Sequence, residues 1–81
     1  MKSDIVEFQF EGEAYEADRA AIVDYRTIKA IARVADNPAG YFDAMERVFM
    51  GEDEAYAEKV GGAEGLARLF NAAVAAANAK N

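Results

Sequence analysis

The sequence contains no cysteine and no histidine. Without cysteine the chain cannot form a disulfide, a thiolate metal site or a cysteine nucleophile, and it is compatible with a reducing cytoplasm. The absence of histidine removes the commonest general base and the commonest metal ligand. Apart from tyrosines, the hydroxyl side chains are Ser3 and Thr27, which build no catalytic triad without a base. We therefore expect no enzymatic activity, no catalytic residue, no metal site and no cofactor.

Two short segments have some features of ligand-binding motifs but are better explained as helix boundaries. The acidic run Glu52-Asp53-Glu54 lacks the alternating carboxylates and the central glycine of a calcium loop, and it suits the positive N-terminal end of a helix. The glycine-rich residues 61–65 lack the lysine and the serine or threonine of a phosphate loop, so they are interpreted as a break between helices.

Long hydrophobic runs and an excess of basic residues are also missing. The alanine-rich segment Ala72 to Ala79 is far shorter than the ~20 apolar residues of a membrane-spanning helix, and the first four residues lack the apolar stretch of a signal peptide. The net charge of −6 and the pI of about 4.5 argue against nucleic acid or an anionic membrane as the partner. We expect a cytoplasmic protein that binds another protein.

The length of 81 residues corresponds to one domain, residues 1–81. A chain this short buries roughly 60% of the surface that its unfolded form exposes, which leaves little room for a deep small-molecule substrate cleft. Hydrophobic residues make up 53% and charged residues 30% of the chain, a mixture typical of a globular domain. Strand signals come first and helix signals follow, so the expected fold class is α+β, with an N-terminal β-hairpin packed on three to four short helices.

Residues 5–17 are expected to form the hairpin, because apolar and polar residues alternate with the period of a half-buried strand. Glu11-Gly12 is the expected two-residue turn, since glycine takes positive φ without strain. This turn predicts the pairs Phe10–Glu13, Phe8–Tyr15 and Val6–Ala17. The last two pairs would supply one apolar face, which must pack on helices because a lone hairpin is marginal in water.

The helical part is expected over residues 19–78. Asp18 and Asp24 both fit the N-cap of the first helix, within residues 19–35, and an irregular turn followed by a regular helix from about Tyr25 is favoured. The other helices are expected at 38–50, where Pro38 fits the first turn and Gly51 ends the helix, at 53–60, and at 63–78.

The apolar spacing of these helices predicts their buried stripes. The first helix should bury Tyr25, Ile28, Ile31, Ala32 and Ala35. The second should bury Phe42, Met45 and Phe49, with Tyr41 and Val48 beside them. The last should bury Leu66, Leu69, Phe70, Ala73, Val74 and Ala77.

Arg26, Lys29 and Arg33 fall on one face of the first helix and form a positive patch in an acidic chain. They are either solvated side chains that pair with neighbouring acids, or a docking patch for an acidic segment or for a second copy of the chain. Tyr41 and Tyr56 are further candidate interface residues, since a phenol can stay half-exposed at an interface. The five residues are the predicted protein interface.

The last helix is a second candidate surface. Leu69, Phe70 and Val74 either complete the core or lie beside residues that dock a partner helix.

Four segments together resemble the small tail assembly chaperones of long-tailed bacteriophages. They are FQFEGEAYE at 8–16, VDYRTI at 23–28, DNP at 36–38 and VFMGEDEAY at 48–56. Members of that family open with a similar hairpin motif, followed by an Asp-aromatic helix start, an Asn/Asp-Pro break and a helix ending near a Gly-acidic-x-x-Tyr motif. The resemblance covers about residues 6–60. Beyond Gly61 the chain departs from it, with an alanine-rich helix in place of a more charged ending.

This resemblance implies a phage or prophage protein that acts in virion morphogenesis. Such chaperones coat the long helical tape-measure protein before the tail-tube subunits polymerise around it, in the host cytoplasm. The family has no catalytic residues that could be assigned to positions of this sequence. Self-association into a homo-oligomer is compatible with the modest core. The alternative function is a small acidic adaptor or inhibitor, antitoxin-like, that presents its charge to a basic protein.

Overall fold

The computed structural model describes residues 4–79, and it confirms the predicted α+β class: an N-terminal hairpin precedes a series of helices. In chain order the elements are β1 (Ile5–Phe10), β2 (Glu13–Asp18), α1 (Arg19–Ile22), α2 (Tyr25–Ala32), α3 (Pro38–Val48), α4 (Asp53–Val60) and α5 (Ala63–Ala79). Ser3 lies outside the described residues.

The hairpin has the predicted register. Strands β1 and β2 are antiparallel, with Phe10 opposite Glu13, Phe8 opposite Tyr15 and Val6 opposite Ala17. Side chains alternate between the two faces of a strand, and the members of the last two pairs are all buried. The Phe8 and Tyr15 ring centroids lie 6.0 Å apart, which is within the range of stabilising aromatic pairs.

The hairpin turn is made by Glu11 and Gly12, with φ angles of 52° and 85°. Positive φ at both central positions matches the right-handed twist of the flanking strands, so this turn type is the usual one for a two-residue hairpin loop. Glycine adopts this conformation freely, whereas Glu11 does so against its steric preference.

Two aspartates start two successive helices. The Asp18 Oδ1 atom accepts a hydrogen bond from the Ala20 backbone N–H at 3.0 Å, and it caps the short helix α1. The Asp24 Oδ1 atom accepts from the Arg26 N–H at 2.7 Å and caps α2. The predicted irregular turn before the regular helix is therefore α1, and both candidate caps are used.

The remaining helices begin and end close to the predicted residues. Asn37 caps α3 by accepting from the Gly40 N–H at 3.4 Å, and Met50 and Gly51 leave α3 with φ angles of 57° and 84°. Gly61 ends α4 in the left-handed conformation. The longest helix is α5 with 17 residues, and none of the helices within residues 4–79 has the length and apolarity to cross a bilayer.

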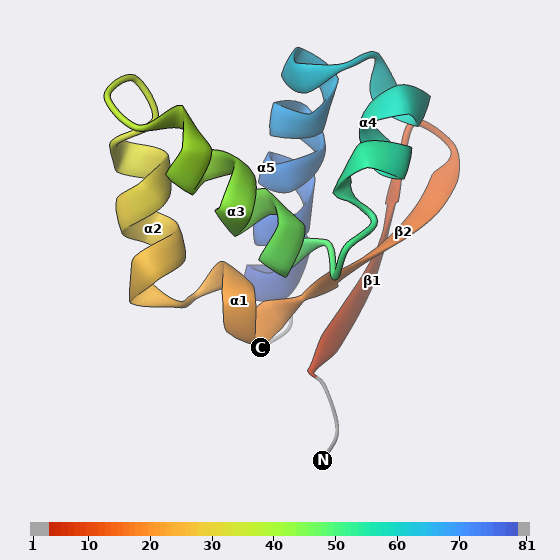
Figure 1. Ribbon diagram of the computed structural model, residues 1–81. Coiled ribbons are helices and arrows are strands. Elements are labelled where there is room, and N and C mark those ends of the chain that lie inside the picture. Colours follow the sequence, from red (N-terminus) through yellow and green to blue (C-terminus); the bar gives the residue numbers. More distant parts are fainter. Residues whose placement is uncertain (1–3, 80–81) are drawn as a thin grey trace.

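Helices α3 and α5 lie in the middle of the molecule, with the hairpin on one side and α2 on the opposite side (Figure 1). The packing follows this order, because α5 packs on β1 and α4, while α2 packs on α3. The largest fully buried apolar side chains come from the middle helices and the residue that follows α3: Met45, Val48, Phe49 and Leu69. The predicted stripe of α5 is largely confirmed, since only Phe70 and Val74 are half-buried and the other members are buried.

The predicted buried face of α2 is wrong. Tyr25 is 72% and Ile28 55% exposed, Ala32 and Ala35 are also exposed, and Ile31 alone is half-buried. The fully buried residue of this helix is Thr27, whose Oγ1 accepts a hydrogen bond from Arg47 of α3 at 3.2 Å. This contact orients α2 so that Ile28 lies about a quarter turn away from the core.

The predicted burial of Phe42 is also wrong, because this side chain is 57% exposed. Helix α3 buries Ala44, Met45 and Val48, a stripe about a third of a turn away from Phe42. The prediction used Phe49 to define the stripe, but Phe49 is the C-cap of α3 and reaches the core from outside the regular helix.

Candidate functional site

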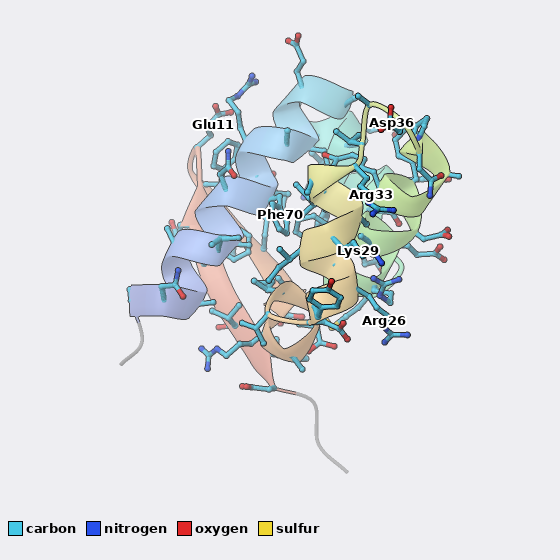
Figure 2. All side chains as sticks on the ribbon, turned by 90° about the vertical axis from the view of Figure 1, so that its left-hand side faces the viewer. Glu11, Arg26, Lys29, Arg33, Asp36 and Phe70 are labelled. Atoms are coloured by element: carbon cyan, nitrogen blue, oxygen red, sulfur yellow. The ribbon has the colours of Figure 1, made fainter. Side chains whose placement is uncertain are left out.

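Three of the five predicted interface residues lie together. Arg26, Lys29 and Arg33, which we call the basic row, follow one side of α2 and its C-cap, and all three are exposed (Figure 2). They stand three and four positions apart, so the helix places them on one face. A hollow of about 210 Å³ beside the row is completed by Ala30 and Asn37.

The cations of the basic row differ in their surroundings. The Arg26 Nη2 atom forms an ion pair with the Asp24 Oδ2 atom at 3.1 Å. This side-chain hydrogen bond, together with the backbone N–H of Arg26, holds the pKa of Asp24 below its usual value, and Asp24 in turn raises the pKa of Arg26. The Lys29 Nζ atom lies 5.9 Å from the Tyr25 ring centroid. Among residues 4–79, no ion pair involves Lys29 or Arg33.

The two predicted interface tyrosines lie elsewhere. Tyr56 is on α4, where its hydroxyl oxygen accepts a hydrogen bond from the Glu16 N–H at 3.4 Å and its ring centroid is 4.9 Å from that of Tyr15. It therefore joins α4 to the hairpin. Tyr41, on α3, is half-buried, and this burial raises the pKa of its phenol. Its ring centroid lies 5.7 Å from that of Phe42.

A second surface feature lies on the other side of α2. An apolar groove of about 350 Å³ runs between α2 and α5, and we call it the α2–α5 groove. Its lining residues are Ile22, Val23, Ile28, Ile31, Phe70, Val74 and Asn78. Phe70 lies between the two helices in Figure 2. The apolar side of α2 thus forms one wall of this groove.

Of the groove residues, the apolar spacing of the sequence predicts Ile28, Ile31, Phe70 and Val74 as core positions, and it gives no prediction for the other three. Val23 is 60% exposed and was not among the predicted interface residues. The sequence did contain an indication of an exposed apolar surface. Apolar residues stand at positions 22, 23, 28 and 31, and one core-facing stripe cannot bury all of them. Phe70 and Val74 lie in the groove, and the alternative that α5 docks a partner beside them stays a prediction.

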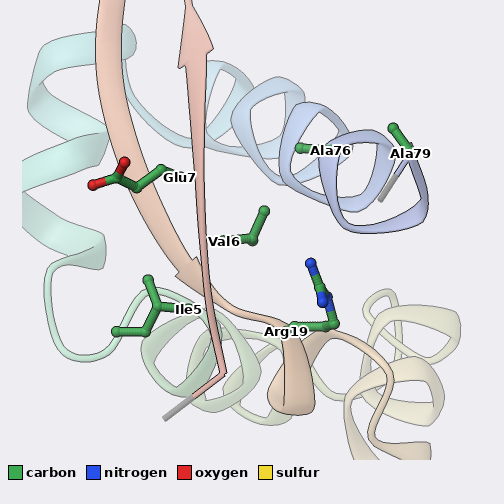
Figure 3. Close-up of a pocket in the computed structure, with 6 residues that line it drawn as sticks. All are labelled: Ile5, Val6, Glu7, Arg19, Ala76 and Ala79. Carbon is green, nitrogen blue, oxygen red and sulfur yellow. The ribbon is translucent and has the colours of Figure 1, made fainter. Parts of the chain in front are cut away.

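A further cavity of about 300 Å³ lies between β1 and the end of α5, lined by Ile5, Val6, Glu7, Arg19, Ala76 and Ala79 (Figure 3). Arg19 pairs with Asp4 at 3.5 Å, and its Nε atom is buried without a hydrogen-bond partner in the described chain. The guanidinium is therefore held at the hairpin and belongs to this cavity, separate from the basic row.

The outer face of the hairpin carries negative charge. Glu7 and Glu16 lie directly opposite each other on β1 and β2 and are both exposed. Like charges in such a pair are destabilising. Glu13, next to the turn, shares the other face of the hairpin with Phe10, and its Oε1 atom lies 3.3 Å from the Lys59 Nζ atom.

The chemical groups of these surfaces suit binding to a polypeptide. The α2–α5 groove offers apolar surface, and the basic row on the other side of α2 offers cationic hydrogen-bond donors. Within residues 4–79, no three acidic side chains come close enough together to hold a metal ion.

The chain matches no protein-family model, and no match is found among the curated proteins or the solved structures.

Proposed function

We propose that this chain is a non-catalytic tail assembly chaperone that binds the helical tape-measure protein of a long-tailed phage in the host cytoplasm. The observation that carries the proposal is the outward orientation of α2, which leaves large apolar side chains in an open groove on one side of the helix and a row of cations on the other. The sequence resemblance supplies the identity of the client.

The physical properties of the domain suit this role. A long amphipathic helix is protected from aggregation only when its apolar side is covered by another surface. The α2–α5 groove offers such a surface on an 81-residue chain with a net charge of −6. Net charge far from zero keeps a complex soluble.

Co-expression with the tape-measure protein tests the proposal. The expected result is a soluble complex that co-purifies, whereas the tape-measure protein alone precipitates. If the tape-measure protein is equally insoluble with and without this chain, the proposed function is wrong.

Charge reversal of the whole basic row tests its part in this function. The combined variant Arg26→Glu, Lys29→Glu and Arg33→Glu should bind the client more weakly, while its circular dichroism spectrum stays unchanged because the three side chains are exposed. Arg68→Glu, at an exposed position on α5, is the control for charge reversal outside the row. Undiminished client binding by the combined variant would refute a role of the row.

The acidic outer face of the hairpin favours a second candidate function, an adaptor or inhibitor of a basic protein. A basic partner would relieve the repulsion between Glu7 and Glu16. This function predicts binding whose association rate falls as ionic strength rises, and which the double variant Glu7→Gln and Glu16→Gln abolishes. Salt-insensitive association would count against it.

A further inference from the structure

We infer that the α2–α5 groove, with Lys29 at its rim, is a docking surface, and that its partner is an amphipathic helix with an acidic flank beside its apolar stripe. The inference rests on the proposed function for the identity of the client, but its chemical content can be tested without that client.

The groove is a fixed feature of the fold, because α2 is anchored on α3 and its own first turn is capped. Thr27 is fully buried and bonded to Arg47 of α3, and Asp24 caps the first turn of α2. Rotating α2 to bury Ile28 would break the hydrogen bond between Arg47 and Thr27. It would also move the Thr27 side chain out of its buried position. The apolar wall of the groove therefore stays open for a partner.

The walls of the groove can bury a partner's apolar side chains. Val23 and Ile28 are 60% and 55% exposed, and Phe70 and Val74 are half-buried on the α5 side. The eight residues of α2 span about 12 Å, so a partner helix would contact it over two to three turns. Apolar anchors spaced at i, i+3 or i+4 and i+7 fit a groove of this length.

Charge sets the chemistry of the partner's flank. Successive residues of a helix are separated by about 100°, so Lys29 lies next to Ile28 at the outer rim of the groove. Arg26 is already paired with Asp24, and Lys29 and Arg33 have no ion pair within residues 4–79. A helix in the groove with carboxylates on that flank would pair with Lys29, whereas Arg33 lies further round α2. The rest of this acidic chain would repel the same helix, which favours this one site.

Two synthetic helical peptides test the inference directly. Both would have about 18 residues and the same leucine stripe at i, i+3, i+4 and i+7, but one has glutamate and the other lysine along the flank. The acidic peptide should bind at least tenfold more tightly at low salt, and this advantage should shrink as ionic strength rises. Equal binding, or tighter binding of the lysine peptide, would overturn the inference.

Matched variants locate the binding site. Ile28→Gln should weaken binding of the acidic peptide at least tenfold, whereas Phe42→Gln should leave it unchanged, because Phe42 is an equally exposed apolar residue (57% against 55%) outside the groove. Lys29→Glu should weaken binding more than Arg68→Glu does. If Phe42→Gln weakens binding as much as Ile28→Gln, or Arg68→Glu as much as Lys29→Glu, the peptide does not bind in the α2–α5 groove.

Sedimentation of the free chain tests the remaining alternative, in which a second copy of the chain fills the groove. If a second copy fills the groove, the chain will sediment as a dimer that Ile28→Gln dissociates, and the inference is then wrong. A monomer that binds the acidic peptide but fails to solubilise the tape-measure protein would retain this inference and reject the proposed function.

Discussion

Two residues at turns, Glu11 and Met50, have an unfavourable backbone conformation. Glu11 and Met50 are the residues other than glycine with positive φ among the described positions. For residues with a Cβ atom, this region costs free energy because the Cβ atom approaches the carbonyl oxygen. Both lie next to a glycine at the end of an element, where the path of the chain requires the conformation.

Replacement of Glu11 by asparagine should stabilise the domain by about 0.5–1 kcal/mol, because asparagine tolerates left-handed backbone better and Asn-Gly is the preferred sequence of this turn. Urea unfolding measures the change. Glu11→Gln, which removes the same charge without favouring left-handed backbone, is the control for charge. A loss of stability in Glu11→Asn would show that the turn conformation is not the one described.

Asp24 should make stability depend on pH in the acid range. Its pKa in the folded chain lies below 3.8 because it bonds to Arg26, so its contribution is present above that pH and is lost as pH falls through the folded pKa. Asp24→Asn keeps an oxygen for the cap but has no charge. The native chain should exceed the variant in melting temperature at pH 7, and the gap should close in stronger acid. A gap that is constant with pH would contradict this account.

At the scale of elements, the hairpin could be predicted from the sequence, while the orientation of α2 could not. Strict alternation and Gly12 fix which residues of a hairpin share a face, because the period of a strand is two and the turn sets the register. For α2 the prediction assumed that the larger apolar stripe faces the core. The structure buries Thr27 instead, since it bonds to Arg47 from another helix, and this long-range contact leaves no local signal.

The same limit applies to the candidate site. The spacing of the basic row could be read from the sequence, because Arg26, Lys29 and Arg33 need only one helix to align. The groove could not, because it combines α2 with α5, which begins 31 residues after α2 ends. Tyr56 is half-buried, and its contacts with Glu16 and Tyr15 could not be predicted because they join α4 to a hairpin about 40 residues earlier in the chain.

The junction between α4 and α5 depends on the missing side chain of Gly65. A Cβ atom at this position would overlap the backbone carbonyl of Val60 and lie 3.0 Å from its Cγ2 atom. Gly65→Ala should therefore destabilise the domain by about 2 kcal/mol, although alanine is the better helix former.

Thermal or urea unfolding checks this change against Ala75→Gly, at an exposed position of the same helix. Ala75→Gly should lose about 1 kcal/mol, since glycine lowers helix stability at an ordinary site. Stabilisation by Gly65→Ala would mean that α4 and α5 do not approach as closely as described.

At the scale of the whole molecule, two surfaces of opposite character lie on opposite sides. The hairpin presents the carboxylates of Glu7 and Glu16 outward, while α2 presents apolar side chains and the basic row on the other side of α3 and α5 (Figure 1). A partner can therefore distinguish the two sides by charge. This arrangement is the physical reason for our proposal that a client binds on the α2 side and that the hairpin side repels acidic clients.

The most direct test of this assignment is a nuclear magnetic resonance titration of the isotope-labelled chain with a helical segment of the tape-measure protein. The account predicts that the amide shifts change most at Val23, Ile28, Lys29 and Val74, and that those of Glu7 and Glu16 stay in place. Changes centred on the hairpin, with α2 and α5 unaffected, would contradict the account.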